Sequence, residues 1–506
     1  MTGPWVDARP ADPLTDSVRT LTRMALDRAQ DEGARAQLSE ALDRLSQPLR
    51  LAIAGRVKAG KSTLLNALIG EELAPTDAGE CTRLVTWYIG GDSAQVVVHR
   101  RDGRREERPY RRDAGALDVD LGAEVEEIDH LEVTWPSSRL RDVTLIDTPG
   151  IASLSTEVSE RVSVLLPTDD ERPQTADAVL YLLRHAHASD IRFLEDFHDD
   201  ELGRGTPVNA VGVLSRADEI GSCRLDALDI ATRVAGRYQQ DQRIRRLCPL
   251  VIPVSGLLGQ AGTTLREEEY RALSRIAALP EAVMADLLLT ADRLIADQGR
   301  SPTADLTPLE RRHLIDRLGL FGVRFSVMLI RTGAVRSATE LAIRLAGSSG
   351  LDELRDVLLH QFSERSQLLR ARSALASVRA VIRRGGCREP DLLDVTAEEI
   401  ASSAHEFREI RLLNDLRSGV LTVQPQRWDE MERLLGGSGH SSAARLGLRE
   451  NATEADLHTT ALQVLDSWQV VANSPLSGRP VQLAARVVIR TVEGILAGLT
   501  PAPGWP

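Results

Sequence analysis

The sequence predicts an α/β fold with a doubly wound, mainly parallel sheet, followed by an α-helical bundle. Three observations support this fold class. A glycine-rich motif at residues 55–62 follows a short apolar run. Further apolar runs, each ending at a polar residue, alternate with helical segments up to about residue 285. Beyond that point the strand patterns stop and helical periodicity continues alone, so we expect sheet and bundle in different parts of the chain.

The organisation of the chain follows from its length and patterning. The 506 residues are too many for a single core. We expect residues 1–48 to be an N-terminal helical segment that joins the bundle, residues 49–285 to be the sheet domain, and residues 286–506 to be the bundle. Apolar side chains recur every three or four positions within residues 14–47 until Pro48 interrupts the helical pattern.

The strand-rich part of the sheet domain is residues 85–135. There Asp102 and Gly103 separate two strand patterns, which predicts a β-hairpin with a type I′ turn. Further strands are expected at residues 51–54, 130–135, 143–146, 178–183, 210–214 and 250–254.

Two helical signals stand out in the bundle. Residues 351–384 read as one helical segment, with Leu351 and Leu375 near its two ends on the same apolar face. Thr453 and Asp456 form a capping signature, which predicts the start of a later helix.

Charge and cysteine usage narrow the class of protein. A net charge of −12 argues against a dedicated nucleic-acid binder, which usually has a basic face. The N-terminus has no apolar signal core, and no apolar run approaches the length of about 18 residues that spans a membrane. We therefore expect a cytoplasmic protein whose membrane contact, if any, is peripheral at the inner face. The cysteines lie too far apart for a metal motif or a disulfide framework: Cys81, Cys223, Cys248 and Cys387.

The glycine-rich stretch at residues 55–62 fits the phosphate-binding P-loop pattern G-x-x-x-x-G-K-[ST]. The chain has 62 basic residues, and its only two lysines, Lys58 and Lys61, both lie in this stretch. A lysine retained there is expected to place its slim ammonium group between the phosphates, where a wide, forked guanidinium does not fit. Lys61 is predicted to reach the β- and γ-phosphates, and the Ser62 hydroxyl to bind Mg²⁺. The loop and the following helix would bind the phosphates through Gly55, Lys58, Ala59, Gly60, Lys61, Ser62 and Thr63.

A second metal and switch element, D-x-x-G, follows a strand and runs from Asp147 to Gly150. Asp147 is predicted to hold Mg²⁺ through water, and the Gly150 amide to sense the γ-phosphate. A threonine between the two motifs must close over the metal. Thr76, Thr82 and Thr86 are candidates, and Thr82 is preferred; the alternative is a solvated loop threonine.

Recognition of the base is predicted at Ser215, Arg216 and Asp218, again directly after a strand. The Asp218 carboxylate can accept hydrogen bonds from guanine N1 and N2, which adenine does not offer. The aliphatic part of the Arg216 side chain can lie against the face of the base. The usual guanine element is [NT]-K-x-D, so the first two positions differ, and a helix-capping Asp218 is the alternative. Ser255 and Gly256 follow the next strand and fit the last element, whose backbone contacts guanine O6.

Five elements in this order predict a regulatory GTPase with GTP as substrate and Mg²⁺ as cofactor. The long flanks resemble those of bacterial dynamin-like proteins, in which an N-terminal helix packs with C-terminal helices as a neck and trunk. Within that group, the sequence is most similar to the actinobacterial isoniazid-inducible proteins of the IniC type. The stretches that carry this resemblance are residues 48–83, 147–154, 214–220, 253–258, 318–324 and 436–447.

This resemblance implies GTP hydrolysis coupled to association, either as a homodimer through the GTPase domains or with a paralogous dynamin-like protein. It also implies membrane remodelling or protection under cell-envelope or drug stress. The alternative is a GTP-controlled scaffold that does not deform lipid. A GTPase of RNA or ribosome assembly is disfavoured by the acidic charge.

One departure from the family concerns Val57 and Lys58, which replace the Gln and Ser that dynamins usually carry in the P-loop. Those residues position the attacking water and help to bind a monovalent cation. We hypothesise that Lys58 replaces the cation or acts as a built-in counterpart of an arginine finger. The alternative is a solvent-facing lysine.

The sequence shows no convincing membrane anchor. Seven arginines lie within residues 100–112, but a solvated hairpin is the favoured interpretation. Residues 318–330 and 480–499 carry apolar faces that more often belong to a core. The glycine-rich loop at residues 436–442 has almost no apolar side chain to insert.

Overall fold

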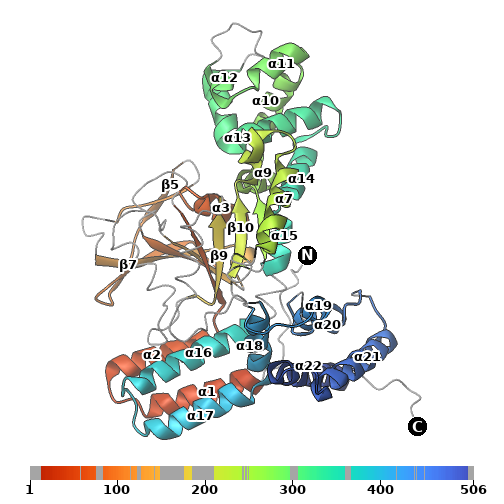
Figure 1. Cartoon of the computed structure of the whole chain (residues 1–506). Helices are drawn as coiled ribbons and strands as arrows, with labels where there is room; N and C mark the ends of the chain where they lie inside the picture. Colours follow the sequence, from red (N-terminus) through yellow and green to blue (C-terminus); the bar gives the residue numbers. More distant parts are fainter. Residues whose placement is uncertain are drawn as a thin grey trace.

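The computed structural model contains a mixed sheet with helices on both faces and further helical layers (Figure 1). It describes most of the chain, in segments whose bounds are residues 13–56, 58–75, 84–113, 116–121, 127–141, 143–148, 176–184, 210–241, 244, 248, 250–296, 306–358, 366–417, 419–437, 439, 441–449 and 451–499.

The main sheet has nine strands in the order β11-β10-β9-β1-β8-β2-β7-β3-β4. Five neighbouring strands, from β11 to β8, run parallel. β2 is antiparallel to β8 and parallel to β7, and the remaining pairs are antiparallel. The strands are β1 (Leu49–Gly55), β2 (Val85–Gly90), β3 (Gln95–Arg100), β4 (Arg105–Glu107), β7 (Ile128–Trp135), β8 (Val143–Asp147), β9 (Ala178–Leu183), β10 (Ala210–Ser215) and β11 (Val251–Val254).

The central strands are continuous apolar runs because both faces of the parallel half are covered. Every residue of β1, β9 and β10 is buried. The doubly wound, mainly parallel sheet expected from the sequence is therefore confirmed. A separate two-stranded hairpin consists of β5 (Tyr110–Asp113) and β6 (Ala116–Val119).

The hairpin between β3 and β4 is present, but its turn is not of type I′. Gly103 has φ 86°, whereas Asp102 is not among the described non-glycine residues with positive φ. The Gly103 amide donates to the Arg100 carbonyl (3.0 Å), and the Arg100 amide donates to the Arg104 carbonyl (2.9 Å). This is a three-residue connection in which a left-handed glycine follows the turn. The prediction of type I′ was wrong because the D-G pair also fits this longer loop.

Helices α11 (Glu281–Leu287), α12 (Ala291–Ala296), α13 (Pro308–Arg331) and α14 (Ala338–Ser348) do not stand apart from the sheet domain. They share one apolar core with α9 (Gly256–Thr264) and α10 (Glu267–Ala277). The fully buried Phe321 lies in this core. Helices α3 (Lys61–Ile69), α7 (Ala227–Gln240) and α15 (Leu351–Val357) pack on the sheet. The predicted boundary near residue 285 stays a prediction.

The N-terminal helices α1 (Pro13–Asp27) and α2 (Glu32–Arg44) lie beside α16 (Ser366–Arg383) and α17 (Pro390–Ser403) (Figure 1). These four helices bury a common core. A second core surrounds the fully buried Trp468. It is formed by α18 (His405–Arg417), α19 (Pro425–Leu434), α20 (Ser442–Leu446), α21 (Glu454–Asn473) and α22 (Arg479–Gly498).

Two local helix predictions have different outcomes. The capping box of Thr453 and Asp456 at the start of α21 is confirmed. The apolar face predicted for residues 351–384, by contrast, does not pack in a single core. Leu351 packs with the sheet, whereas Leu375 packs with α1 and α2. None of the described helices combines the length and apolarity needed to cross a membrane.

Candidate nucleotide site

The loop between β1 and α3 requires unusual backbone angles. Gly55 has φ 148°, and a Cβ there would lie 3.0 Å from the backbone oxygen of Leu182 on the neighbouring strand. Gly60 has φ 94° and is the N-cap of α3. Lys58 is exposed and adopts the left-handed region with φ 62°. Glycine is required at the first two positions, and the resulting turn presents backbone amides at the start of the helix.

The Lys61 side chain folds back over this loop. Its Nζ donates to the carbonyl oxygens of Gly55 (3.2 Å) and Arg56 (3.4 Å). Burial lowers the pKa of Lys61, and the nearby Asp147 carboxylate opposes that shift. An ammonium group held by two carbonyls in a partly buried position gains from an anionic partner, so a phosphate fits here.

Asp147 and Ser62 face each other across the ends of β8 and α3. Ser62 Oγ donates to Asp147 Oδ2 at 3.3 Å. Burial raises the pKa of Asp147 to about 6, although Lys61, Ser62 and Thr148 oppose the shift. Its Oδ1 is buried and has no hydrogen-bond partner among the described residues. Buried oxygen donors of this kind fit a hard cation such as Mg²⁺.

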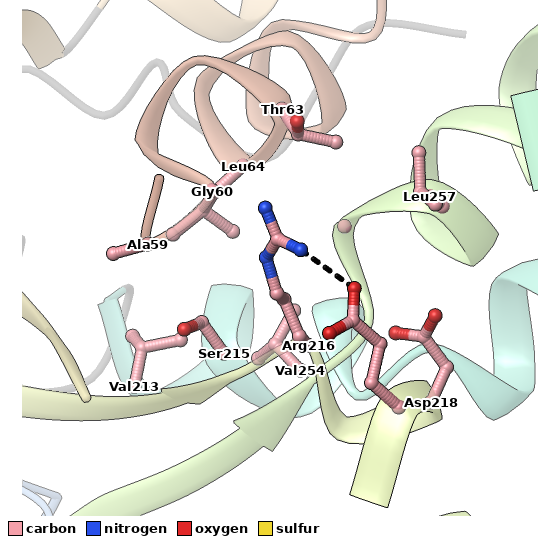
Figure 2. A pocket seen from close by; sticks show the side chains of 12 residues that line it. Ala59, Gly60, Thr63, Leu64, Val213, Ser215, Arg216, Asp218, Val254 and Leu257 are labelled. Atoms are coloured by element: carbon pink, nitrogen blue, oxygen red, sulfur yellow. Dashed lines mark hydrogen bonds and ion pairs between the residues drawn. The ribbon is translucent and has the colours of Figure 1, made fainter. Parts of the chain in front are cut away.

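A pocket of about 130 Å³ lies beside the start of α3. It is lined by Ala59, Gly60, Thr63, Leu64, Val213, Ser215, Arg216, Asp218, Glu219, Val254, Gly256 and Leu257. Figure 2 shows the Arg216 side chain extending across this pocket toward α3. Arg216 has φ 53° and pairs with Glu219 (Nη1 to Oε1, 2.7 Å). The pocket therefore brings together residues that follow β10 and β11 with residues of the P-loop.

Three predicted base-contacting residues are placed differently in this pocket. Asp218 is 4% exposed; burial raises its pKa, and a hydrogen bond from the Ser255 hydroxyl opposes that shift. Ser255 is also the N-cap of α9 and accepts from the Leu258 amide at 3.3 Å. The Ser215 hydroxyl instead donates to the Leu183 carbonyl at 3.2 Å, which links β10 to β9. Of these three side chains, Asp218 is the one that neither caps a helix nor links two strands.

Helix α13 packs against Asp218 and Leu257, which line this pocket, and sequence reasoning did not predict that contact. The helix is interrupted at Gly319 (φ 66°, ψ 171°). A Cβ at Gly319 would lie 3.6 Å from Asp218 Oδ2 and 3.3 Å from Leu257 Cδ1. Arg324, further along the helix, donates to the carbonyls of Cys223 (2.7 Å) and Leu288 (2.8 Å). From the sequence, residues 318–324 contribute only to the family resemblance. No local sequence pattern indicates that this segment lies near Asp218.

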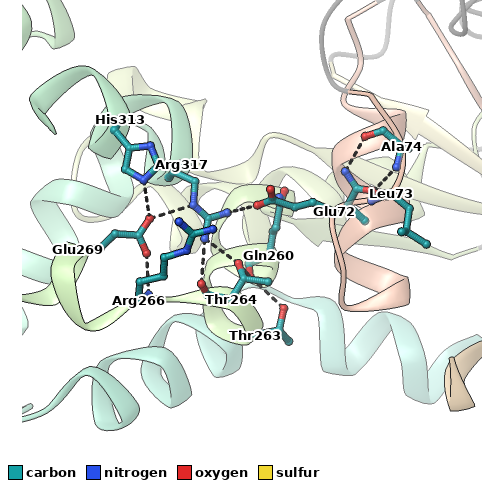
Figure 3. Close-up of polar contacts among 11 residues, drawn as sticks. Glu72, Leu73, Ala74, Gln260, Thr263, Thr264, Arg266, Glu269, His313 and Arg317 are labelled. Carbon is teal, nitrogen blue, oxygen red and sulfur yellow. Dashed lines mark hydrogen bonds and ion pairs between the residues drawn. The ribbon is translucent and has the colours of Figure 1, made fainter. Parts of the chain in front are cut away.

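A network of charged side chains connects α13 with the segment after α3 (Figure 3). Arg317 donates to Glu269 Oε1 (3.0 Å) and Thr264 Oγ1 (2.7 Å), and it also pairs with Glu72. His313 lies 3.2 Å from the same Glu269 oxygen. Glu269 is 4% exposed, so its charge is compensated within the protein. This network positions α13 relative to the P-loop helix.

Several predicted residues lie outside the described residues: Val57, Thr76, Thr82, Pro149 and Gly150. The third candidate threonine, Thr86, is buried in β2 directly opposite Asp147. The structure thus brings together Lys61, Ser62, Asp147 and the Asp218 pocket, all at the carboxyl ends of the parallel strands. That edge is where open α/β sheets bind their ligands.

Comparison with known proteins gives the family. A model described as the Dynamin family matches residues 51–215. The isoniazid-induced protein IniC of Mycobacterium tuberculosis is 38% identical over 463 residues, which cover 91% of this chain and 92% of IniC. The isoniazid-induced protein IniA of the same species is 29% identical over 275 residues, or 50% of this chain and 38% of IniA. A bacterial dynamin-like protein of Nostoc punctiforme is 28% identical over 174 residues, or 31% of this chain and 24% of that protein. The chain therefore belongs to the dynamin family of GTP-binding P-loop proteins, within the group that contains IniC.

Proposed function

We propose that this protein hydrolyses GTP to GDP at the edge of the sheet formed by β1, β8 and β10. The observation that carries the proposal is the meeting of Lys61, Ser62 and Asp147 beside the pocket that contains Asp218. Lys61 would exchange its two carbonyl partners for phosphate oxygens. When bound, Mg²⁺ would neutralise charge on the β- and γ-phosphates.

The residues of the chain have distinct parts in this proposal. Ser62 would hold the metal directly, and Asp147 would hold it through water. Thr82 would close over the metal, and the Gly150 amide would sense the γ-phosphate. Backbone amides of the P-loop and of the start of α3 would bind the phosphate oxygens. The residues concerned are Gly55, Lys58, Ala59, Gly60, Lys61, Ser62 and Thr63.

Guanine selection is proposed to rest on Asp218. Its buried carboxylate has a raised pKa because it is desolvated, and two N–H donors on a base edge would compensate the ionised form. Arg216 would lie along the base, while Ser255 and Gly256 supply the adjoining backbone. Adenine offers no such pair of donors and would leave the carboxylate unpaired.

Lys58 is proposed to supply positive charge to the transition state. Its exposed side chain starts from a left-handed position in the P-loop, two residues before Gly60. A lysine there could take the place of a monovalent cation. If Lys58→Ala left GTP turnover unchanged, or if turnover depended on potassium, this role would be excluded.

We further propose that turnover is coupled to association and to membranes. The partner is a second copy through the GTPase domains or a paralogous dynamin-like protein, and the place of action is the inner face of the cell membrane. The name of the IniC relative connects that protein with isoniazid and so supports a role under drug or envelope stress. Leu476, between α21 and α22, is 96% exposed and offers an apolar side chain for peripheral contact.

The second candidate function is a GTP-controlled scaffold that assembles with a paralogue and does not deform lipid. The burial pattern favours it: the apolar faces of α13 and α22 lie in the cores described above and are not available to a membrane.

The test is steady-state turnover of GTP and ATP by the full chain, with and without anionic liposomes. Lys61→Ala is the control for turnover by a contaminant. Lipid-stimulated GTP turnover that disappears in the variant supports the membrane-acting enzyme, and liposome tubulation or tethering would separate it from the scaffold. GTP turnover indifferent to lipid favours the scaffold, and equal use of ATP contradicts the guanine assignment.

A further inference from the structure

Two histidines and a glutamate meet on the face of the sheet formed by β3 and β7. His99 on β3 lies directly opposite His130 on β7, and Val97 lies opposite Glu132. His130 and Glu132 are two residues apart in one strand, so their side chains leave the same face of the sheet. One ligand atom from each of His99, His130 and Glu132 lies within 4.8 Å of the other two. Three donors from two paired strands therefore converge on one point.

The environment of each side chain prepares it as a ligand. The Nδ1 of His130 lies 2.8 Å from Asp129 Oδ2, so a proton shared there leaves Nε2 with a free lone pair. His99 Nε2 lies 3.2 Å from Glu132 Oε2. The side chains of His99 and His130 are 14% and 16% exposed, whereas Glu132 is 30% exposed. The cluster is thus partly sheltered and still open to an ion from solvent.

A stack of rings positions the histidines. The ring centroids of His99 and His130 are 4.2 Å apart, and those of His130 and Trp87 are 4.6 Å apart. The Arg50 guanidinium covers the far side of Trp87 at 4.5 Å from the ring centroid. The stack limits the rotamers of both imidazoles, which lowers the entropy lost when an ion binds.

We propose that His99, His130 and Glu132 form a site for a divalent transition metal of the Zn²⁺ type, separate from the nucleotide site. Two imidazoles and one carboxylate are a known donor set for zinc, with water as the fourth ligand. Mg²⁺ prefers oxygen donors and is disfavoured here. Tetrahedral coordination at about 2.1 Å requires donors about 3.4 Å apart, so small rotations of the three side chains would complete the site.

The bound ion would cross-link β3 to β7 near the edge of the sheet. Arg105 lies opposite His99 on β4 and adds positive charge nearby, so we expect weaker affinity than in a four-ligand structural site. Because the ion binds the folded pairing of the two strands, it should raise the unfolding temperature of the protein.

Isothermal titration of Zn²⁺ into tag-free, metal-stripped full-length protein, with excess Mg²⁺ present, tests the proposal. We expect a single equivalent to bind. His99→Gln and His130→Gln should each lower the affinity at least about tenfold. His458→Gln on α21 is the matched control and should bind as the parent does. Absence of binding in the parent, or equal affinity in all variants, would show that the cluster is a packing stack only.

A second measurement is local to the site. Because Trp87 stacks on His130, Co²⁺ or Cu²⁺ in the site should quench Trp87 fluorescence. Trp87→Phe should remove this quenching while one equivalent of metal still binds. Quenching that persists in Trp87→Phe would place the ion elsewhere and overturn the assignment.

Glu132→Gln is a third variant, for the case that the His99 and His130 variants fail to fold. The Glu132 side chain is partly exposed, so this substitution disturbs packing less. Its affinity for Zn²⁺ should also fall, and Zn²⁺ should raise its unfolding temperature less than that of the parent. An unchanged thermal shift in Glu132→Gln would contradict the proposed third ligand.

Discussion

Ser62 Oγ lies 3.3 Å from Asp147 Oδ2, although 85 residues separate them in the chain. The contact arises because β1 and β8 are parallel neighbours, with Ile53 opposite Asp147. The end of β8 therefore reaches the helix that follows β1. The other Asp147 oxygen is buried and has no hydrogen-bond partner among the described residues, so this edge of the sheet has unused capacity for a cation.

Replacing Lys61 with alanine should lower GTP turnover by about 100-fold or more, because the ammonium group that stabilises charge on the phosphates is lost. Burial lowers the pKa of Lys61, so its charge is unfavourable in the nucleotide-free fold. We therefore expect the unfolding temperature without nucleotide to be unchanged or higher. Calorimetry with and without GTP checks both effects; a lower temperature without nucleotide would indicate general damage.

Asp147→Asn should abolish Mg²⁺-dependent turnover and change the pH dependence of stability. Burial raises the pKa of Asp147 from 3.8 to about 6 in the folded chain. Protonation of this group therefore adds stability that is fully present below pH 3.8 and is lost as pH rises through about 6. Urea unfolding without Mg²⁺ should show this loss in the parent and not in Asp147→Asn. Identical profiles would contradict the raised pKa.

Asp218→Asn should weaken GTP binding and favour xanthosine triphosphate. The asparagine amide would donate a hydrogen bond where the carboxylate accepted one, and xanthine carries a carbonyl in place of the guanine amino group. A lost pair of complementary hydrogen bonds changes discrimination by about 10⁴-fold or more in buried sites. Competition binding with both nucleotides measures the change. Retained preference for GTP would remove Asp218 from the base site.

Gly319→Ala should destabilise the protein by about 1–3 kcal/mol. The backbone at Gly319 (φ 66°, ψ 171°) is almost restricted to glycine, and the new Cβ would approach Leu257 and Asp218. We also expect weaker GTP binding, because the new Cβ would displace Asp218 and Leu257, which line the pocket.

Gly236→Ala is the matched control for Gly319→Ala. Gly236 lies inside α7, and a Cβ there meets nothing within 4 Å. It should be neutral or stabilise the protein by about 0.5–1 kcal/mol. Equal effects of the two substitutions on stability would refute the argument from the kink.

Glu409→Gln should destabilise the core around Trp468 in a pH-dependent way. Burial alone would raise the pKa of Glu409, but His405, Arg445 and Thr491 outweigh it and hold the pKa at about 2 instead of 4.5. The ionised group thus contributes on the order of 3 kcal/mol above pH 4.5, and this is lost as pH falls through about 2.

Chemical unfolding at several pH values tests this contribution. Glu409→Gln should differ most from the parent near neutral pH and least in acid. Glu406→Gln, an exposed position on the same helix, is the control and should match the parent throughout. A pH-independent difference would point to lost packing.

The sequence determined the elements whose information is local. The P-loop is contiguous, the parallel strands are unbroken apolar runs, and Asp147 and Ser215 end two of them, so these features could be predicted from neighbouring residues alone. The capping box of Thr453 and Asp456 has the same origin.

Tertiary structure decided what depends on distant partners. The helical pattern of residues 351–384 could not reveal that Leu351 and Leu375 enter different cores. Likewise, Gly319 approaches Asp218, and His99 pairs with His130, only because packing and strand register bring them together. Periodicity states which face of an element is apolar, whereas the partner of that face is chosen by the free energy of the whole packed chain.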